Sequence, residues 1–240
     1  MKASKDIFLL GLLALLLLIP GRADAQDDEL KNGLMVSTGA SIPFEIFKEK
    51  EFVGMAGFAS TGANMQVDYI RLFWSGFGFS AHLGYSMLPF DERAYESEYD
   101  RILGTQGFAT ANVGNYQVVE GLAGFFFRIP FFFKSRLYLH WQAGYALTFH
   151  PDLEVVHSYW GTLNTVEQVS DFALMNNPGI RLERYITEQY RLHLYYGAFF
   201  TLPGFSDPPE DPTSSVYQPA SYFNLPVRYQ SLNLGLTYRF

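Results

Sequence analysis

Residues 229–240 read YQSLNLGLTYRF, and side chains of two kinds alternate along this segment. One kind is apolar and comprises Leu232, Leu234, Leu236, Tyr238 and Phe240. The other is polar or small and comprises Ser231, Asn233, Gly235, Thr237 and Arg239. Successive side chains of a β-strand point to opposite faces, so the segment predicts a strand with one apolar and one polar face.

Seven segments further upstream show the same alternation with a period of two. They are residues 34–44, 55–73, 77–87, 119–133, 137–149, 173–187 and 191–202. Each is long enough to cross a bilayer when tilted. No stretch after residue 25 is apolar over the 18 residues or so that a spanning helix needs. The pattern therefore predicts an all-β chain of about eight membrane-crossing strands.

The expected connections alternate between short and long. The short ones are residues 74–76, 134–135 and 187–189, and the long ones are residues 45–54, 89–116, 151–172 and 203–228. Short turns at one end and long loops at the other are typical of bacterial outer-membrane barrels. An even number of strands then predicts that both termini lie on the periplasmic side.

The first 25 residues have the order of a secretory signal peptide. Lys2 and Lys5 precede an apolar run over residues 7–19, and Ala23 and Ala25 provide small residues before a cleavage site. The run is shorter than a membrane-spanning helix. We therefore expect residues 1–25 to be a signal peptide and residues 26–240 to be the mature barrel.

The composition fits a protein whose alternate residues face lipid. Charged residues are 17% of the chain and aromatic residues are 18%, whereas ordinary globular domains contain about 25% charged residues. The net charge of −7 argues against a nucleic-acid partner, and the absence of cysteine excludes disulfides. No motif for a cofactor or a metal is present, so none is expected.

Alternation alone does not say which face is outside, since a soluble lipocalin-like barrel alternates too. Three of the residues on the face opposite the apolar one are charged: Arg128, Arg181 and Glu183. Three aromatic residues end the apolar face, as in an interfacial girdle: Tyr69, Phe133 and Tyr238. These features favour an up-and-down antiparallel transmembrane β-barrel.

The end of the chain resembles the C-terminal β-signal of outer-membrane barrels. The residues that carry this resemblance are Asn233, Gly235, Tyr238 and Phe240. The layout of residues 26–240 is similar to small eight-stranded barrels such as the OmpA transmembrane domain, OmpX and the PorT-type proteins. The resemblance implies a place in the bacterial outer membrane, contact with lipid and lipopolysaccharide, and recognition by the barrel-assembly machinery.

Eight polar residues are predicted to form an interior network: Asp68, Glu120, Arg128, His140, Arg181, Glu183, His193 and Arg239. The hairpin around residue 188 is expected to bring Glu183 near His193. The hairpin around residue 134 is expected to bring Arg128 near His140 or Gln142. An eight-stranded barrel is just wide enough to be filled by its side chains, so we expect a structural plug; the alternative is a narrow ion path.

The long loops are acidic. In residues 89–116, five carboxylates lie close together: Asp91, Glu92, Glu96, Glu98 and Asp100. They predict either a solvated rim or a surface that binds divalent cations. Residues 153–169 predict a hairpin beyond the membrane, whose open edge could pair with a strand of a protein partner.

These observations predict a structural or interaction role: membrane integrity, surface contact or an accessory subunit of an outer-membrane complex. One alternative is a narrow channel for ions or small solutes. The other is an enzyme that modifies lipid A or phospholipid, for which His157 and Ser158 are the best candidates, with His150, Asp152 and Glu154 nearby. Because adjacent strand residues face opposite sides, we do not expect an enzyme.

Overall fold

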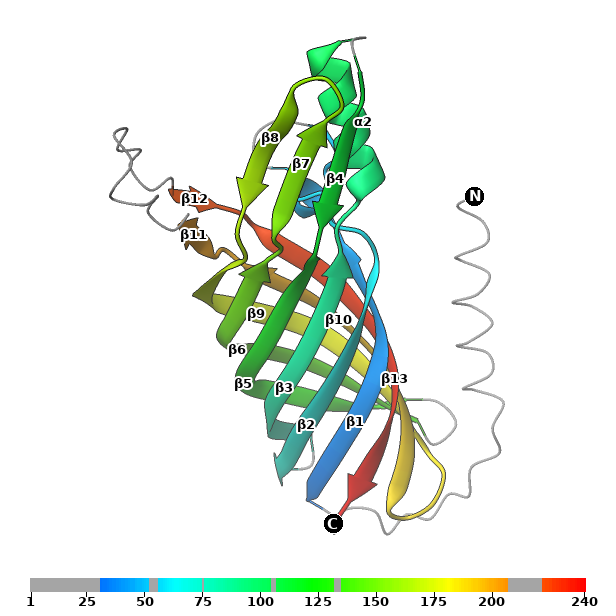
Figure 1. Cartoon of the computed structure of the whole chain (residues 1–240). Coiled ribbons are helices and arrows are strands. Elements are labelled where there is room, and N and C mark those ends of the chain that lie inside the picture. Colours follow the sequence, from blue (N-terminus) through cyan, green and yellow to red (C-terminus); the bar gives the residue numbers. More distant parts are fainter. Residues whose placement is uncertain (1–30, 52–55, 75, 105–106, 132–134, 207–221) are drawn as a thin grey trace.

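Eight long antiparallel strands close into a barrel in the computed structural model (Figure 1), which describes residues 31–51, 56–74, 76–104, 107–131, 135–206 and 222–240. The strands are β1 (Asn32–Pro43), β2 (Gly62–Trp74), β3 (Phe77–Pro89), β5 (Asn115–Phe131), β6 (Ser135–His150), β9 (Val169–Tyr185), β10 (Tyr190–Thr201) and β13 (Val227–Arg239). Each pairs with its neighbours in this order, and β1 pairs with β13 to close the barrel. The predicted up-and-down eight-stranded barrel is confirmed.

The two ends of the barrel differ, as predicted. Short connections join β2 to β3, β5 to β6 and β9 to β10 at one end, which we call the turn end. The C-terminus lies there too, because the backbone N–H groups of Asn32 and Phe240 each donate to the other's carbonyl at 3.1 Å. Long connections lie at the opposite end, which we call the loop end. The predicted signal peptide, residues 1–25, lies outside the described residues.

Several strands begin at other residues than the alternation predicted. β5 begins at Asn115 rather than at residue 119, and β9 begins at Val169 rather than at residue 173. In both strands the added residues lie at the loop end. A strand that leaves the hydrocarbon no longer needs an apolar outer face, so the alternation stops before the hydrogen-bonded ladder does.

A small α/β unit stands on the loop end, and we call it the loop-end module (Figure 1). Strands β4 (Ala109–Val113), β7 (Leu153–His157) and β8 (Gly161–Val166) form a sheet in the order β4-β7-β8, and helix α2 (Glu92–Leu103) packs beside it. The predicted hairpin within residues 153–169 is therefore confirmed as β7 and β8. The prediction that residues 89–116 are only a loop is wrong, since they contain α2 and β4.

The loop-end module has its own hydrophobic core. Its buried apolar residues are Phe58, Tyr95, Ala109, Ala111, Leu153 and Val155. The remaining elements are short and lie near the same end: η1 (Glu45–Phe47), β11 (Gly204–Ser206) and β12 (Tyr222–Asn224). Neither helix in the described part of the chain is long and apolar enough to cross a membrane.

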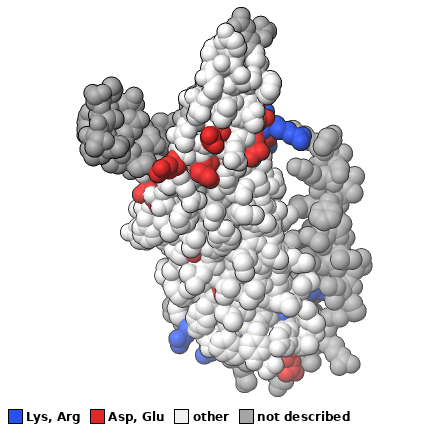
Figure 2. Space-filling view, in the orientation of Figure 1, with Lys and Arg blue, Asp and Glu red and all other residues white. Residues whose placement is uncertain are grey.

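The barrel is apolar outside and polar inside. Leu83 on β3 and Trp141 on β6 point outward and are 68% and 62% exposed. On the same two strands His82 and Gln142 point inward and are buried. Figure 2 shows that charged side chains on this face gather towards the two ends and leave the band between almost without charge. An apolar outer surface over a polar interior is the arrangement that hydrocarbon, rather than water, stabilises around a barrel.

Candidate functional site

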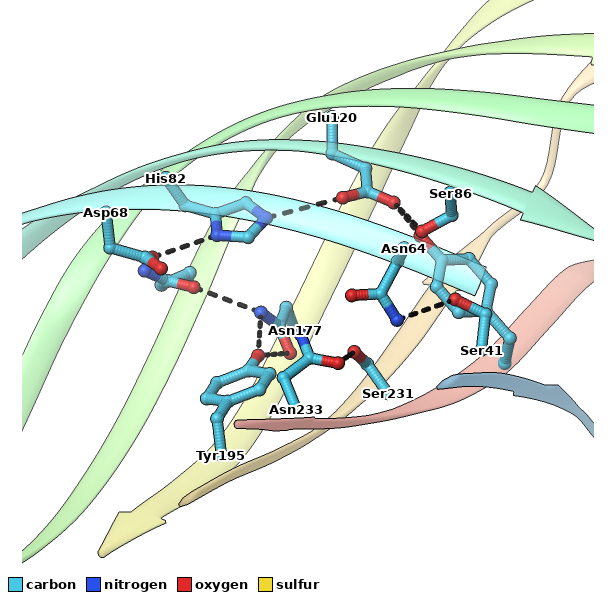
Figure 3. A network of polar contacts seen from close by, with 12 residues as sticks. Ser41, Asn64, Asp68, His82, Ser86, Glu120, Asn177, Tyr195, Ser231 and Asn233 are labelled. Carbon is cyan, nitrogen blue, oxygen red and sulfur yellow. Dashed lines mark hydrogen bonds and ion pairs between the residues drawn. The ribbon is translucent and has the colours of Figure 1, made fainter. Parts of the chain in front are cut away.

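A chain of buried polar contacts crosses the middle of the lumen (Figure 3). The imidazole of His82 lies between two carboxylates, with Nδ1 2.9 Å from Asp68 Oδ1 and Nε2 3.3 Å from Glu120 Oε2. These three residues come from β2, β3 and β5, which are neighbours in the barrel wall. A buried charge costs several kcal/mol unless it is paired and hydrogen-bonded, so His82 stabilises both carboxylates where they are.

The same chain continues across the lumen to the opposite wall. Glu120 accepts hydrogen bonds from the hydroxyls of Ser86 and Tyr229, so it links β5 to β3 and β13. A separate group is centred on Asn177, whose amide donates to Gln142 at 3.0 Å and to the Tyr195 hydroxyl at 2.8 Å, and Gln142 in turn donates to Ser80 at 3.0 Å. Two of these contacts, Tyr229 with Glu120 and Gln142 with Ser80, join strands that are not neighbours, so they tie the barrel walls together from inside.

A cluster of charges fills the lumen at the turn end. The carboxylate of Glu183 lies 3.3 Å from Arg181 Nε, 3.5 Å from Arg191 Nη1 and 3.1 Å from Arg239 Nη2. All four side chains are buried. The Tyr138 hydroxyl accepts from Arg239 at 2.6 Å, and the Arg181 guanidinium lies 4.3 Å from the centre of the Tyr138 ring. These contacts hold several guanidinium groups together in a space with little water.

Most of the predicted interior residues lie in the lumen. Six of the eight are buried, and the other two, Arg128 and His140, are half-buried. The predicted pairing of Glu183 with His193 is confirmed by the β9–β10 register. Arg128, however, lies opposite Tyr138 and not opposite His140 or Gln142. Phe131 pairs with Ser135, so this hairpin is centred one residue earlier than residue 134, which shifts the partner of Arg128 by two residues, from His140 to Tyr138.

Several residues of the network were absent from the predicted set of eight, among them His82, Asn177, Arg191 and Tyr229. Alternation places Arg191 on the same strand face as His193, so the sequence carries a signal for Arg191 too. His82 and Tyr229 also lie on predicted inner faces. Asn177 lies in the predicted segment 173–187 on the same face as Arg181, but Asn176, Pro178 and Gly179 interrupt the apolar alternation there.

The four residues of the C-terminal resemblance lie at the turn end or in the wall above it. Asn233 points into the lumen and is buried, whereas Tyr238 and Phe240 are exposed on the outer surface with their rings stacked at 5.8 Å. A Cβ atom at Gly235 would lie 2.6 Å from His193 Nε2 and 2.4 Å from Ser37 Cβ, so the wall requires glycine there. Their role in assembly stays a prediction.

Comparisons with known proteins return the same architecture. No protein-family model and no curated protein matches the chain. Among solved structures it is similar to Ail, the attachment invasion locus protein of Yersinia pestis, with 14% identity over 88% of this chain and 99% of that chain and a TM-score of 0.45. A major outer membrane protein from Thermus thermophilus has 14% identity, coverages of 87% and 99%, and a TM-score of 0.48.

OprG from Pseudomonas aeruginosa is 8% identical, with coverages of 88% and 97% and a TM-score of 0.45. The chain has the architecture of a small outer-membrane β-barrel. At these identities and TM-scores the likenesses carry no conclusion about this chain, whose fold follows from its own closed eight-stranded wall. Function must therefore be argued from the lumen and the loop-end module.

Helix α2 covers one edge of the module's sheet through its carboxylates. The backbone N–H groups of Ala109, Ala111 and Val113 on β4 donate to the side chains of Asp100, Glu96 and Glu92, at 2.7, 2.8 and 3.3 Å respectively. Four residues of helix rise about 6 Å and two residues of strand rise about 6.8 Å, so every fourth helix residue meets every second strand residue. The acidic run, predicted to be a solvated rim or a surface that binds divalent cations, thus mainly covers the edge of strand β4.

The start of α2 is fixed by Asp91. Its carboxylate accepts from the Ala94 N–H at 3.1 Å, as an N-cap does, and pairs with the Lys50 ammonium. Partial burial acts to raise the pKa of Asp91, but the hydrogen bonds from Lys50 and Ala94 outweigh it and hold that pKa below its ordinary value. Among the residues described, no group of three or more His, Asp or Glu side chains could hold a metal ion.

We expect the double substitution of Glu96 and Asp100 by alanine to loosen the loop-end module without unfolding the barrel. Each substitution removes a hydrogen bond to a charged acceptor, which contributes about 1.5–3 kcal/mol. Amide hydrogen exchange of β4 in detergent micelles measures the effect, and exchange at Ala109 and Ala111 should speed up at least tenfold. Glu154→Ala, on the exposed face of β7, is the control. Unchanged protection of β4 would show that the carboxylates do not hold the edge.

Among the described residues, no carboxylates bond along the opposite edge of the same sheet, strand β8. Its sequence, GTLNTV, contains no charge and no proline, the two residue classes that usually protect an edge strand. Three aromatic side chains are exposed near the tip of the module: Phe108, Tyr159 and Trp160. The Trp160 ring stacks on His157 at 4.4 Å, which fixes its position.

His157 and Ser158 do not have the geometry of an acyl-transfer site. His157 Nδ1 accepts from the backbone N–H groups of Tyr159 and Trp160, at 3.2 and 3.3 Å. The ring proton must then lie on Nε2, which leaves no lone pair to take a proton from a serine. The Ser158 hydroxyl instead accepts from the Phe108 N–H at 3.0 Å. Both side chains serve the turn between β7 and β8.

Proposed function

We propose that the protein is a bacterial outer-membrane barrel with a closed lumen, whose function is to make surface contacts through its loop-end module. The observation that carries this proposal is the asymmetry of the module's sheet. Three carboxylates cover the β4 edge, whereas no described strand pairs with the β8 edge, which is uncharged and lies next to exposed aromatic residues. An open strand edge binds an extended segment of a partner through backbone hydrogen bonds.

The filled lumen supports a structural rather than a conducting barrel. Large side chains occupy it, among them Tyr138, Phe199, Tyr229 and Arg239, all with less than 2% of their surface exposed. We expect no stable conductance steps when the purified protein is inserted into a planar bilayer. Reproducible single-channel steps would instead favour a narrow channel for ions or small solutes.

The orientation follows from the length of the connections. Long connections face the outside in outer-membrane barrels, so the loop-end module lies at the cell surface and both termini lie in the periplasm. The exposed carboxylates at the loop end, such as Asp152, Glu154 and Glu167, would then lie at the level of lipopolysaccharide. A protease added to intact cells should cut within the loop-end module and leave the C-terminus untouched.

The contact role is tested with two matched double variants. Thr162→Lys with Thr165→Lys places two cations on the open strand β8, and Thr110→Lys with Asn112→Lys places two on β4, whose edge α2 covers. All four residues are exposed. Cross-linking in native outer membranes followed by mass spectrometry should recover a stoichiometric protein partner with the wild type and the β4 variant. The β8 variant should recover at least tenfold less.

Two results would contradict this proposal. Equal recovery from both double variants would show that the β8 edge is not the contact surface. The absence of any stoichiometric partner would remove the contact role altogether. A lipid-modifying activity is tested separately by mass spectrometry of lipid A with and without His157→Ala, and we expect no difference.

A further inference from the structure

The lipid-facing surface of β9 is polar near the middle of the strand. Its outward residues are all exposed and run Phe172, Leu174, Asn176, Pro178 and Ile180. Within the described part of the chain, the Asn176 side chain has no hydrogen-bond or ion-pair partner. Hydrocarbon offers an amide no water to bind, and polar side chains in a membrane usually have a partner. A lipid-facing asparagine with apolar residues above and below it therefore needs an explanation.

The barrel wall is also incomplete at this place. Pairing of β9 with β10 stops after Gly179 and resumes at Asn176 in the same register, so Asn177 and Pro178 have no partner in β10. On the other side β9 pairs with β6 without a gap. Proline has no N–H to give to a ladder and is normally confined to edge strands, yet β9 lies between two paired strands. One backbone carbonyl of a neighbouring strand consequently loses a donor within the membrane.

The side chains beside Asn176 leave its amide within reach of another surface. Ala143 of β6 lies directly opposite Asn176, and Ala198 occupies the unpaired position of β10 opposite Pro178. Trp141 and Tyr145, which lie on either side of Ala143, are exposed and offer broad apolar faces. Packing and hydrogen bonds, rather than the hydrophobic effect, drive association within a bilayer, and this surface supplies both.

We propose that a second copy of the chain covers this surface, with the Asn176 amides of the two barrels hydrogen-bonded to each other in the plane of the membrane. A primary amide has a donor and an acceptor on one group. Two copies related by a twofold axis therefore satisfy each other, because such an interface brings the same residue of both chains together. The contact lies on the lipid face and is independent of any partner bound by the loop-end module.

Single cysteines test the contact, since the chain has none of its own. Ala143→Cys, directly opposite Asn176, leaves the amide in place and should form a disulfide-linked dimer when native membranes are oxidised. Val67→Cys is the control, because Val67 is an exposed outward residue near the middle of β2, four strands away from β9 around the barrel. We expect the Val67→Cys barrel to stay monomeric. Equal cross-linking at both positions, or none at Ala143→Cys, would overturn the proposal.

A second measurement separates the hydrogen bond from general proximity. Förster transfer between labelled barrels is measured as the barrels are diluted with lipid. The variants are Asn176→Leu and Asn176→Gln, and heat-modifiable mobility on gels first checks that each has folded. Asn176→Leu should weaken association about tenfold, which is the effect of losing two hydrogen bonds in a membrane. Asn176→Gln keeps the amide and should associate like the wild type. Wild-type association by the leucine variant would overturn the proposal.

Discussion

Replacing Glu183 by alanine is expected to lower the free energy of unfolding of the barrel by about 3–5 kcal/mol, the usual cost of removing one partner from a buried ion pair. Arg181, Arg191 and Arg239 share this carboxylate at the turn end of the lumen. Without it, the guanidinium groups repel one another where little water can screen them. Urea unfolding in lipid vesicles, followed by tryptophan fluorescence, measures the change.

The matched control for this prediction is Glu188→Ala. Glu188 lies in the exposed turn between β9 and β10, so its loss should change stability by less than about 0.5 kcal/mol. Glu183→Gln keeps the shape of the side chain and removes the charge. It should lower the free energy of unfolding about as much as the alanine variant does. If Glu183→Ala unfolded at the same urea concentration as Glu188→Ala, the charge cluster would not stabilise the lumen.

Replacing Leu83 by arginine is expected to destabilise the barrel in a bilayer by about 2–4 kcal/mol, as for a cation on the lipid face near the midplane. Leu83 is the middle residue of β3 and points outward. The same substitution at Thr110, exposed on the loop-end module, should change stability by less than about 0.5 kcal/mol because water surrounds it. Equal effects at the two positions would mean that Leu83 does not face lipid.

The barrel could be predicted from the sequence because lipid imposes a simple rule on every strand. Where a strand crosses hydrocarbon, most outward residues are apolar, so Leu234 and Leu236 of β13 or Leu139 and Trp141 of β6 reveal both the strand and its orientation. Beyond the hydrocarbon the rule no longer applies. The first four residues of β5 and all of β4 therefore gave no signal.

Helix α2 was missed for a different reason. Asp91 before Glu92 is an N-cap signal, and Glu92, Glu96 and Asp100 recur at helical spacing, but the same residues also describe an acidic loop. The edge of β4 is what favours the helix over the loop, and it contacts these carboxylates only after folding. Of the two predicted interior pairs, Glu183 lies opposite His193 as expected, whereas a hairpin that turns one residue earlier moves Arg128 away from His140.

Lipid exposure of single tryptophans tests the central claim, that the apolar face of the wall meets acyl chains while the loop-end module lies in water. Trp74 and either Trp160 or Trp141 are replaced by phenylalanine, and the barrels are reconstituted in vesicles with bromine on the middle of the acyl chains. Trp141 on β6 should be strongly quenched, and Trp160 at the tip of the module should keep its fluorescence. A Trp141 signal unaffected by brominated lipid would contradict the account.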